Sequence, residues 1–156
     1  MRILIIILLV FSLNCSAQIV EPDYTVKKDH STALKTIGIY TASIVLDAVG
    51  DGLMDNGDKQ WGHLCNAAST GILVASPFVI DFKKEDWIWH LTSYTLMRMA
   101  IFDIVYNLTR GLAWNYHGTT SGWDGLWNEL NPPGWAEGYG RTIFFTFAIV
   151  IPLQNM

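Results

Sequence analysis

The chain has 156 residues, a length typical of one domain, and its net charge at pH 7 is −4. Its basic residues are scattered along the sequence, which argues against a nucleic-acid-binding face. Hydrophobic residues make up 51% of the chain, so composition lies between that of soluble proteins and that of typical transporters. Composition alone therefore does not decide between a soluble protein and a membrane protein.

Residues 1–17 have the features of a secretory signal peptide. Arg2 supplies a basic start, an apolar stretch follows, and small residues precede a cleavage site after Ala17. Two alternatives stay open: a lipoprotein modified on Cys15, although the Leu expected three residues earlier is missing, and an uncleaved anchor. In each case the chain leaves the cytoplasm or enters a membrane, and residues 18–156 are expected to form one helical membrane domain.

A first apolar helix is predicted over residues 33–49. Gly50 and Gly52 are expected to end it, since glycine commonly terminates helices. Asp47 and Asp51 are four residues apart, so they share a face if the helix continues that far.

A turn is predicted at residues 55–58, because its Asn-Gly pair tolerates positive φ at low cost. Asp58 can then cap a second helix that runs to about Ser76, where Pro77 is expected to stop it. Small residues recur every four positions in this helix, at Ala67, Gly71 and Ala75. Such a stripe lets helices approach closely in lipid.

The third helix is predicted from about Asp86 to Arg110, with Gly111 as its stop. It carries five polar side chains, which are His90, Arg98, Asp103, Asn107 and Arg110. Such groups are costly in an apolar helix, so each is expected to face a partner or a polar cavity. We predict that Asp103 is ionised and paired with Arg98, with Arg110 or with an arginine of a partner chain. Asn107 lies on the same face as Asp103 and is expected to hydrogen-bond to it or to orient the arginine.

Two further elements complete the chain. A short amphipathic helix is predicted after Ser121, within a tryptophan-rich connection over residues 112–134. The last apolar helix is predicted over residues 139–153, with Arg141 at its entrance and Pro152 at its end.

These elements predict an all-α bundle of about four membrane-embedded helices, with the short amphipathic helix before the last one. The tryptophans lie at the ends of the apolar segments, as an aromatic belt at a membrane interface requires. A compact periplasmic or other extracytoplasmic domain is the alternative. A cleaved signal would place the start of the first helix outside, whereas the lysines near that start favour the inside, so the orientation stays open.

Chemistry could reside where polar residues of three helices face a common interior. The candidate ligands for a divalent metal ion are Asp47, Asp51, His63 and His90. The candidates for acid/base or other catalytic roles are Asp103, Asn107, Arg98, Arg110 and His90. The sequence contains no recognised metal-binding spacing such as His-Glu-x-x-His.

Three functions are compatible with these features. The preferred one is a non-enzymatic integral membrane protein of the cell envelope, whose buried His/Asp/Arg/Asn cluster is structural. The second is a metal-dependent or acid/base hydrolase that acts on a lipid-linked or envelope substrate, and the third is an extracytoplasmic bundle that binds a small ligand or ion. Membrane lipid is the expected partner, nucleic acid is not, and a homo-oligomer stays open.

The stretch from Asp58 to His63, Asp-Lys-Gln-Trp-Gly-His, resembles the Asp-Lys-x-x-His signature of VanZ-like and YfiM-like small envelope proteins, with a spacing one residue longer. Residues 102–107 and 118–121 are also similar to small membrane proteins of bacteria and their phages, and the likeness covers about residues 55–125. The resemblance implies a multi-helix envelope protein and no particular reaction. The residues to which it gives importance are Asp58, His63, Asp103 and Asn107.

Overall fold

The computed structural model describes residues 31–80, 82–117, 129 and 134–155. Across these residues the chain forms helices and no strand, which confirms the predicted all-α class. The long helices are α2 (Ser31–Asp55), α3 (Lys59–Val79), α4 (Trp87–Thr109) and α6 (Gly134–Asn155), and a short 3-10 turn, η1 (Lys84–Asp86), precedes α4. The predicted signal peptide and, apart from the helical residue Glu129, the predicted amphipathic helix lie outside the described residues.

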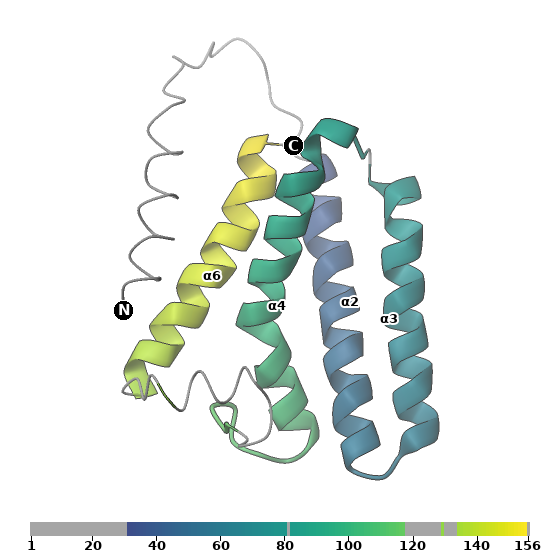
Figure 1. The fold of residues 1–156 in the computed structure, drawn as a ribbon, viewed down its shortest axis with the longest axis vertical. Coiled ribbons are helices and arrows are strands. Elements are labelled where there is room, and N and C mark those ends of the chain that lie inside the picture. The colour runs from purple at the N-terminus through teal and green to yellow at the C-terminus, as the bar shows by residue number, and fades with distance from the viewer. Residues whose placement is uncertain (1–30, 81, 118–128, 130–133, 156) are drawn as a thin grey trace.

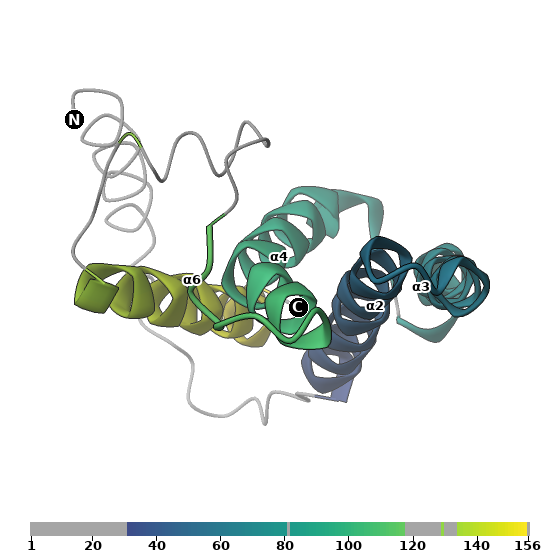
Figure 2. The same cartoon turned by 90° about the horizontal axis from the view of Figure 1, so that it is seen from below.

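The four long helices stand side by side and alternate in direction along the chain (Figure 1). Seen from below, they lie in the order α6, α4, α2, α3 (Figure 2). α2 packs against α3 on one side and against α4 on the other, and α6 packs mainly against α4 and to a smaller extent against α2. The bundle is therefore an open row, in which α2 and α4 are the central helices.

The prediction that Gly50 and Gly52 end the first helix is wrong, because α2 continues through both to Asp55. A Cβ atom on Gly50 would lie 1.8 Å from Asn66 Oδ1 of α3, and one on Gly52 would lie 2.8 Å from Thr109 Cβ of α4. Both glycines thus mark positions where a neighbouring helix comes too close for a side chain. Gly57 does take positive φ, at 91°, in the predicted turn between α2 and α3.

The two prolines that were expected to stop helices lie inside them, Pro77 in α3 and Pro152 in α6. A helical proline lacks the N–H that would bond to the carbonyl four residues earlier. For Pro77 that carbonyl belongs to Leu73, and it accepts a hydrogen bond from Ser76 Oγ at 2.8 Å. For Pro152 it belongs to Ala148, and it accepts from Ser93 Oγ of α4 at 2.7 Å. A serine hydroxyl therefore replaces the missing donor in each helix.

The described interior contains nearly as many polar as apolar side chains. Nine buried residues are hydrophobic, and a core cluster is formed by Tyr40, Ile44, Ile80, Met97 and Ala148. Seven buried residues are polar or charged, namely Thr36, Ser43, Ser69, His90, Ser93, Asn107 and Arg141. Large apolar side chains are instead exposed on all four long helices, with Phe78 the most exposed at 90%.

The predicted small-residue stripe does not face another helix of the chain, since Ala67, Gly71 and Ala75 are all exposed. α3 instead approaches α2 through Gly62, where a Cβ atom would lie 2.7 Å from the carbonyl oxygen of Gly50. Among the described helices, α2 alone combines the length and the apolar composition of a membrane span. A core helix of a soluble protein can have the same properties, so this finding by itself does not establish a membrane location.

Candidate functional site

Three carboxylates of α2 bind side chains from neighbouring helices. Asp47, Asp51 and Asp55 are spaced by four residues, so they lie on one side of the helix. Their respective partners are Arg98 of α4, Asn66 of α3 and Tyr106 of α4.

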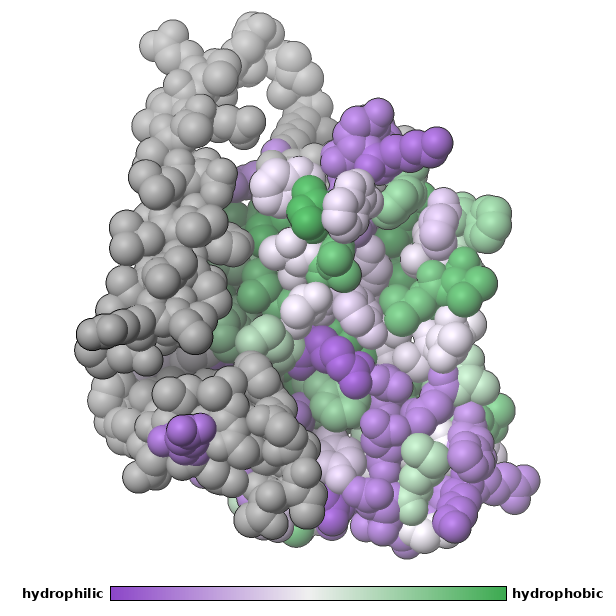
Figure 3. All heavy atoms as spheres, viewed as in Figure 1, coloured by the Kyte–Doolittle hydropathy of each residue, from purple (hydrophilic) through white to green (hydrophobic). Residues whose placement is uncertain are grey.

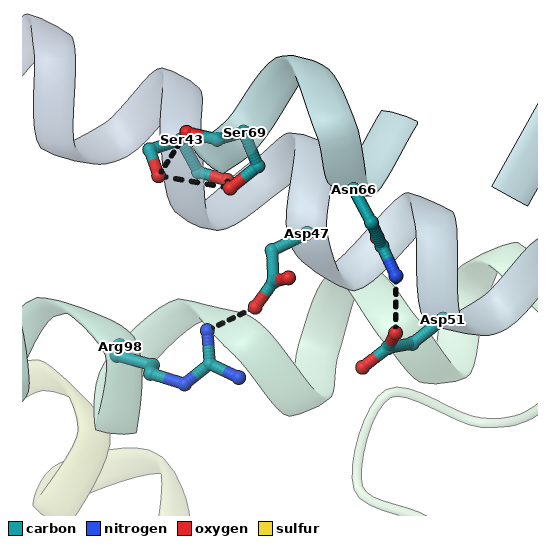
Figure 4. A network of polar contacts seen from close by, with 6 residues as sticks. All are labelled: Ser43, Asp47, Asp51, Asn66, Ser69 and Arg98. Carbon is teal, nitrogen blue, oxygen red and sulfur yellow. Dashed lines mark hydrogen bonds and ion pairs between the residues drawn. The ribbon is translucent and has the colours of Figure 1, made fainter. Parts of the chain in front are cut away.

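Asp47 and Arg98 form an ion pair between the two central helices (Figure 4). This contact gives Arg98 a partner, as expected for a charged group in an apolar helix, but the partner is not Asp103. The Arg98 guanidinium also lies over the Phe102 ring, 4.0 Å from its centroid, in cation–π geometry. Both charged side chains are partly exposed, at 37% for Arg98 and 26% for Asp47, so the pair borders the surface of the bundle.

Polar contacts also join α2 to α3 (Figure 4). Ser69 Oγ donates to the carbonyl oxygen of Ser43 at 2.8 Å, and the two serine hydroxyls are 3.0 Å apart. Asn66 Nδ2 donates to Asp51 Oδ1 at 2.8 Å. The other amide atom, Asn66 Oδ1, is buried without a hydrogen-bond partner among the described residues. It lies against the backbone of Gly50, at the place that a Cβ atom would occupy in any other residue. A contact of this kind is a weak Cα–H···O hydrogen bond.

Asp103 pairs with an arginine, as predicted, but the partner is neither Arg98 nor Arg110. Arg141 of α6 donates from Nη2 to Asp103 Oδ2 at 3.1 Å and from Nη1 to the carbonyl oxygen of Met99 at 3.2 Å. The Arg141 side chain is only 6% exposed, against 25% for Asp103. The residue expected at a helix entrance is therefore a buried cation that joins α6 to α4.

Arg110 lies at the far end of α4, where its Nη1 donates to the Tyr106 hydroxyl at 3.0 Å and its Nε is 3.7 Å from Asp55 Oδ2. Tyr106 in turn donates to Asp55. The prediction for Asn107 is wrong, because it contacts the chain beyond α4 rather than Asp103. Its Nδ2 donates to the carbonyl oxygen of Tyr116 at 2.8 Å, so it closes the C-terminal end of the helix.

Neither candidate histidine, His63 or His90, contacts Asp47 or Asp51. His90 is buried, with its Nδ1 2.9 Å from the Tyr40 hydroxyl and its ring 4.7 Å from that of Phe82. His63 is exposed on α3. Within the described residues, no three His, Cys, Asp or Glu side chains converge as ligands for a metal ion. The four candidate metal ligands therefore have different neighbours. Asp47 contacts Arg98, Asp51 contacts Asn66, His63 is exposed to solvent and His90 contacts Tyr40.

Several contributing residues were not predicted as part of the cluster. Tyr40, Ser43 and Tyr106 lie in apolar segments of their helices. Their hydroxyl groups carry no charge, so the sequence gives no sign that they need a partner. Arg141 offered a signal, since a single arginine within the apolar α6 also needs a partner. The resulting arrangement places hydrogen bonds at the α2–α3 contact and both ion pairs and hydrogen bonds at the α2–α4 and α4–α6 contacts, and these interactions stabilise the packing of the four helices.

Comparison with protein-family models, with curated proteins and with solved structures gave no significant match for this chain.

Proposed function

We propose that this chain is a small integral membrane protein of the cell envelope, and that its buried polar cluster holds the helices together without performing catalysis. The observation that carries the proposal is the distribution of polarity. Charged and hydrogen-bonding groups in the middle of the helices face one another, and large apolar side chains face outward. A water-soluble bundle requires the opposite arrangement, whereas lipid favours this one.

The ends of the helices support the same placement. In α2, α3, η1 and α4, every described charged residue that is exposed lies within five residues of a helix end, apart from Arg98, whose side chain is 37% exposed and paired with Asp47. Among the described residues, the exposed Trp61, Trp87, Trp89, Trp114 and Tyr139 also lie within five residues of a helix end, and the exposed Tyr116 follows the end of α4 by seven residues. On the face shown in Figure 3, hydrophilic residues form one group at the upper end and a larger one over the lower half, with mostly hydrophobic or near-neutral residues between them. Aromatic residues at the two limits of an apolar zone are typical of a membrane interface.

Hydroxyl groups on the outer face of α6 need no water. Thr142 Oγ1 donates to the carbonyl oxygen of Gly138, and Thr146 Oγ1 donates to that of Thr142, both at 2.8 Å. The carbonyls freed by Pro77 and Pro152 also accept from serines rather than from solvent. Internal satisfaction of this kind is how membrane helices tolerate proline and hydroxyl residues.

The helix lengths fit a bilayer. The four long helices contain 21 to 25 residues, which corresponds to roughly 32 to 38 Å at 1.5 Å per residue. The hydrocarbon core of a bilayer is about 30 Å thick. The envelope location rests on the resemblance to envelope proteins.

Alkaline carbonate extraction tests the location directly. The full chain, expressed in a bacterial host with a C-terminal tag, should remain in the membrane pellet at high pH and should enter solution only with detergent. A peripheral membrane protein of the host serves as the control for release. Recovery of the chain in the carbonate supernatant would overturn the proposal and would favour a compact extracytoplasmic domain.

A double-mutant cycle tests the structural role of the cluster. Arg98→Met and Asp47→Leu should each lower the thermal stability of the purified protein in detergent, because each leaves one charge without its partner. The double variant should recover most of the loss, since both charges are removed together. Additive losses in the double variant would show that the two residues do not act as a pair.

A further inference from the structure

The two ends of the bundle differ in their basic residues. One end, called here the lysine end, consists of the start of α2 and the connection between α3 and α4 (Figure 1). It carries the exposed side chains Lys35, Lys83 and Lys84. In the sequence, Lys27 and Lys28 precede the first residue of α2 by only four and three positions.

The opposite end, called here the turn end, contains the α2–α3 turn and the C-terminal end of α4. In the α2–α3 turn and the first residues of α3, the exposed basic residue is Lys59. Arg110, at the end of α4, donates a hydrogen bond to the Tyr106 hydroxyl and lies close to Asp55. Arg98 and Arg141 belong to neither end, because each is paired with an aspartate inside the bundle. The structure thus removes Arg141 from the count of basic residues at the turn end.

From this asymmetry we infer that the lysine end faces the cytoplasm and contacts anionic phospholipid headgroups of the inner leaflet, and that the turn end faces away from the cytoplasm. The inference rests on the proposed membrane location. Lys and Arg near the ends of membrane helices are retained on the cytoplasmic side, and the anionic inner leaflet attracts them. Glu85 and Asp86 also lie at the lysine end, but acidic residues contribute little to this preference.

Exposed aromatic residues at the same end suit this contact. Phe82, Trp87 and Trp89 flank the two lysines of the connection and are 41%, 56% and 37% exposed. Aromatic rings at the level of the headgroups, beside lysines that reach toward phosphate, form a common interfacial arrangement. The inferred orientation is opposite to the one that a cleaved signal peptide would impose on α2.

Cysteine labelling in spheroplasts tests the orientation. In a full-length Cys15→Ser/Cys65→Ala background, Glu85→Cys marks the lysine end and Gln60→Cys marks the turn end, and both positions are exposed. A membrane-impermeant maleimide should label Gln60→Cys in intact spheroplasts and should label Glu85→Cys only after lysis. The reverse pattern would overturn the inferred orientation and leave the membrane location standing. Labelling of both positions before lysis would overturn the membrane location and the orientation together.

The role of the lysines is tested by charge reversal. Lys83→Glu/Lys84→Glu, combined with Gln60→Cys, should lower the labelled fraction in intact spheroplasts, because the signal that retains this end is removed. Lys59→Glu in the same background is the matched control at the opposite end and should leave the labelled fraction at least as high. Unchanged labelling with both lysines reversed would refute their part in setting the orientation.

Discussion

The hydrogen bond from Ser93 to Ala148 allows a quantitative test of how this bundle accommodates a proline inside a helix. Ser93 and Ala148 are both 0% exposed, and their O···O distance is 2.7 Å. In Ser93→Ala the Ala148 carbonyl loses this donor and cannot gain one from residue 152, which is a proline. A buried polar group left without a partner costs about 1–3 kcal/mol. We expect Ser93→Ala to lower the free energy of unfolding by that amount.

The same substitution should cost less when the proline is absent. In Pro152→Ala the restored N–H can donate to the Ala148 carbonyl, as in an ordinary α-helix. Loss of the serine then removes only one of two donors, and its expected cost falls to roughly 0.5–1 kcal/mol, the net value of a typical hydrogen bond. The coupling between the two sites should therefore be on the order of 1–2 kcal/mol.

The assay is reversible unfolding of the four purified proteins in detergent, which are the parent chain, both single variants and the double variant. Ser76→Ala provides a matched comparison, because Ser76 bonds to the carbonyl freed by the more exposed Pro77 and should matter less. An equal cost of Ser93→Ala with and without Pro152 would refute the reasoning, since it would show that the hydroxyl does not replace the missing N–H.

Three further predictions use the same unfolding measurement. Gly50→Ala should lower the free energy of unfolding by about 1–3 kcal/mol, because the added methyl group overpacks the contact with α3. Gly38→Ala is the control, since a Cβ atom there meets nothing within 4 Å, and it should be neutral or slightly stabilising. Equal effects of the two substitutions would contradict the close helix contact. Asp103→Ala should cost about 3–5 kcal/mol because it leaves the buried Arg141 cation uncompensated, and Asp103→Asn should be milder, so equal losses would argue against the ion pair. Asp58→Ala removes an exposed helix cap whose hydrogen bond is 3.4 Å long, so it should cost only about 0.5–1 kcal/mol, and a much larger loss would indicate a further role for this carboxylate.

Local signals in the sequence predicted most of the helix starts and turns. Asp58 caps α3 by accepting from the Trp61 N–H, and Gly57 and Gly111 both take positive φ beside helix ends. These features depend on neighbours within a few residues, so the local sequence is sufficient. The glycines and prolines inside helices misled the prediction because their role depends on residues of other helices. Gly50 is explained only by the approach of α3, and Pro152 only by the hydroxyl of Ser93.

The candidate site followed the same division. Helical spacing shows from sequence alone that Asp103 is an ionisable group in an apolar helix and needs a partner. It cannot show which arginine is the partner, because Arg98, Arg110 and Arg141 are all compatible with that requirement. In the structure Asp103 pairs with Arg141, which lies 38 residues later in the chain. Arg98 pairs instead with Asp47, which lies 51 residues earlier.

By itself, the sequence determined that this chain is helical, where its turns lie and which of its helices contain charges that must be paired. Each of these properties follows from the local periodicity of apolar residues and from caps and turns within a few positions. Only the tertiary structure decided that the helices form an open row, which partner each charged group takes and which helix faces remain exposed. These properties depend on how each helix is rotated and shifted relative to its neighbours. Contacts between side chains far apart in the sequence determine that rotation and shift.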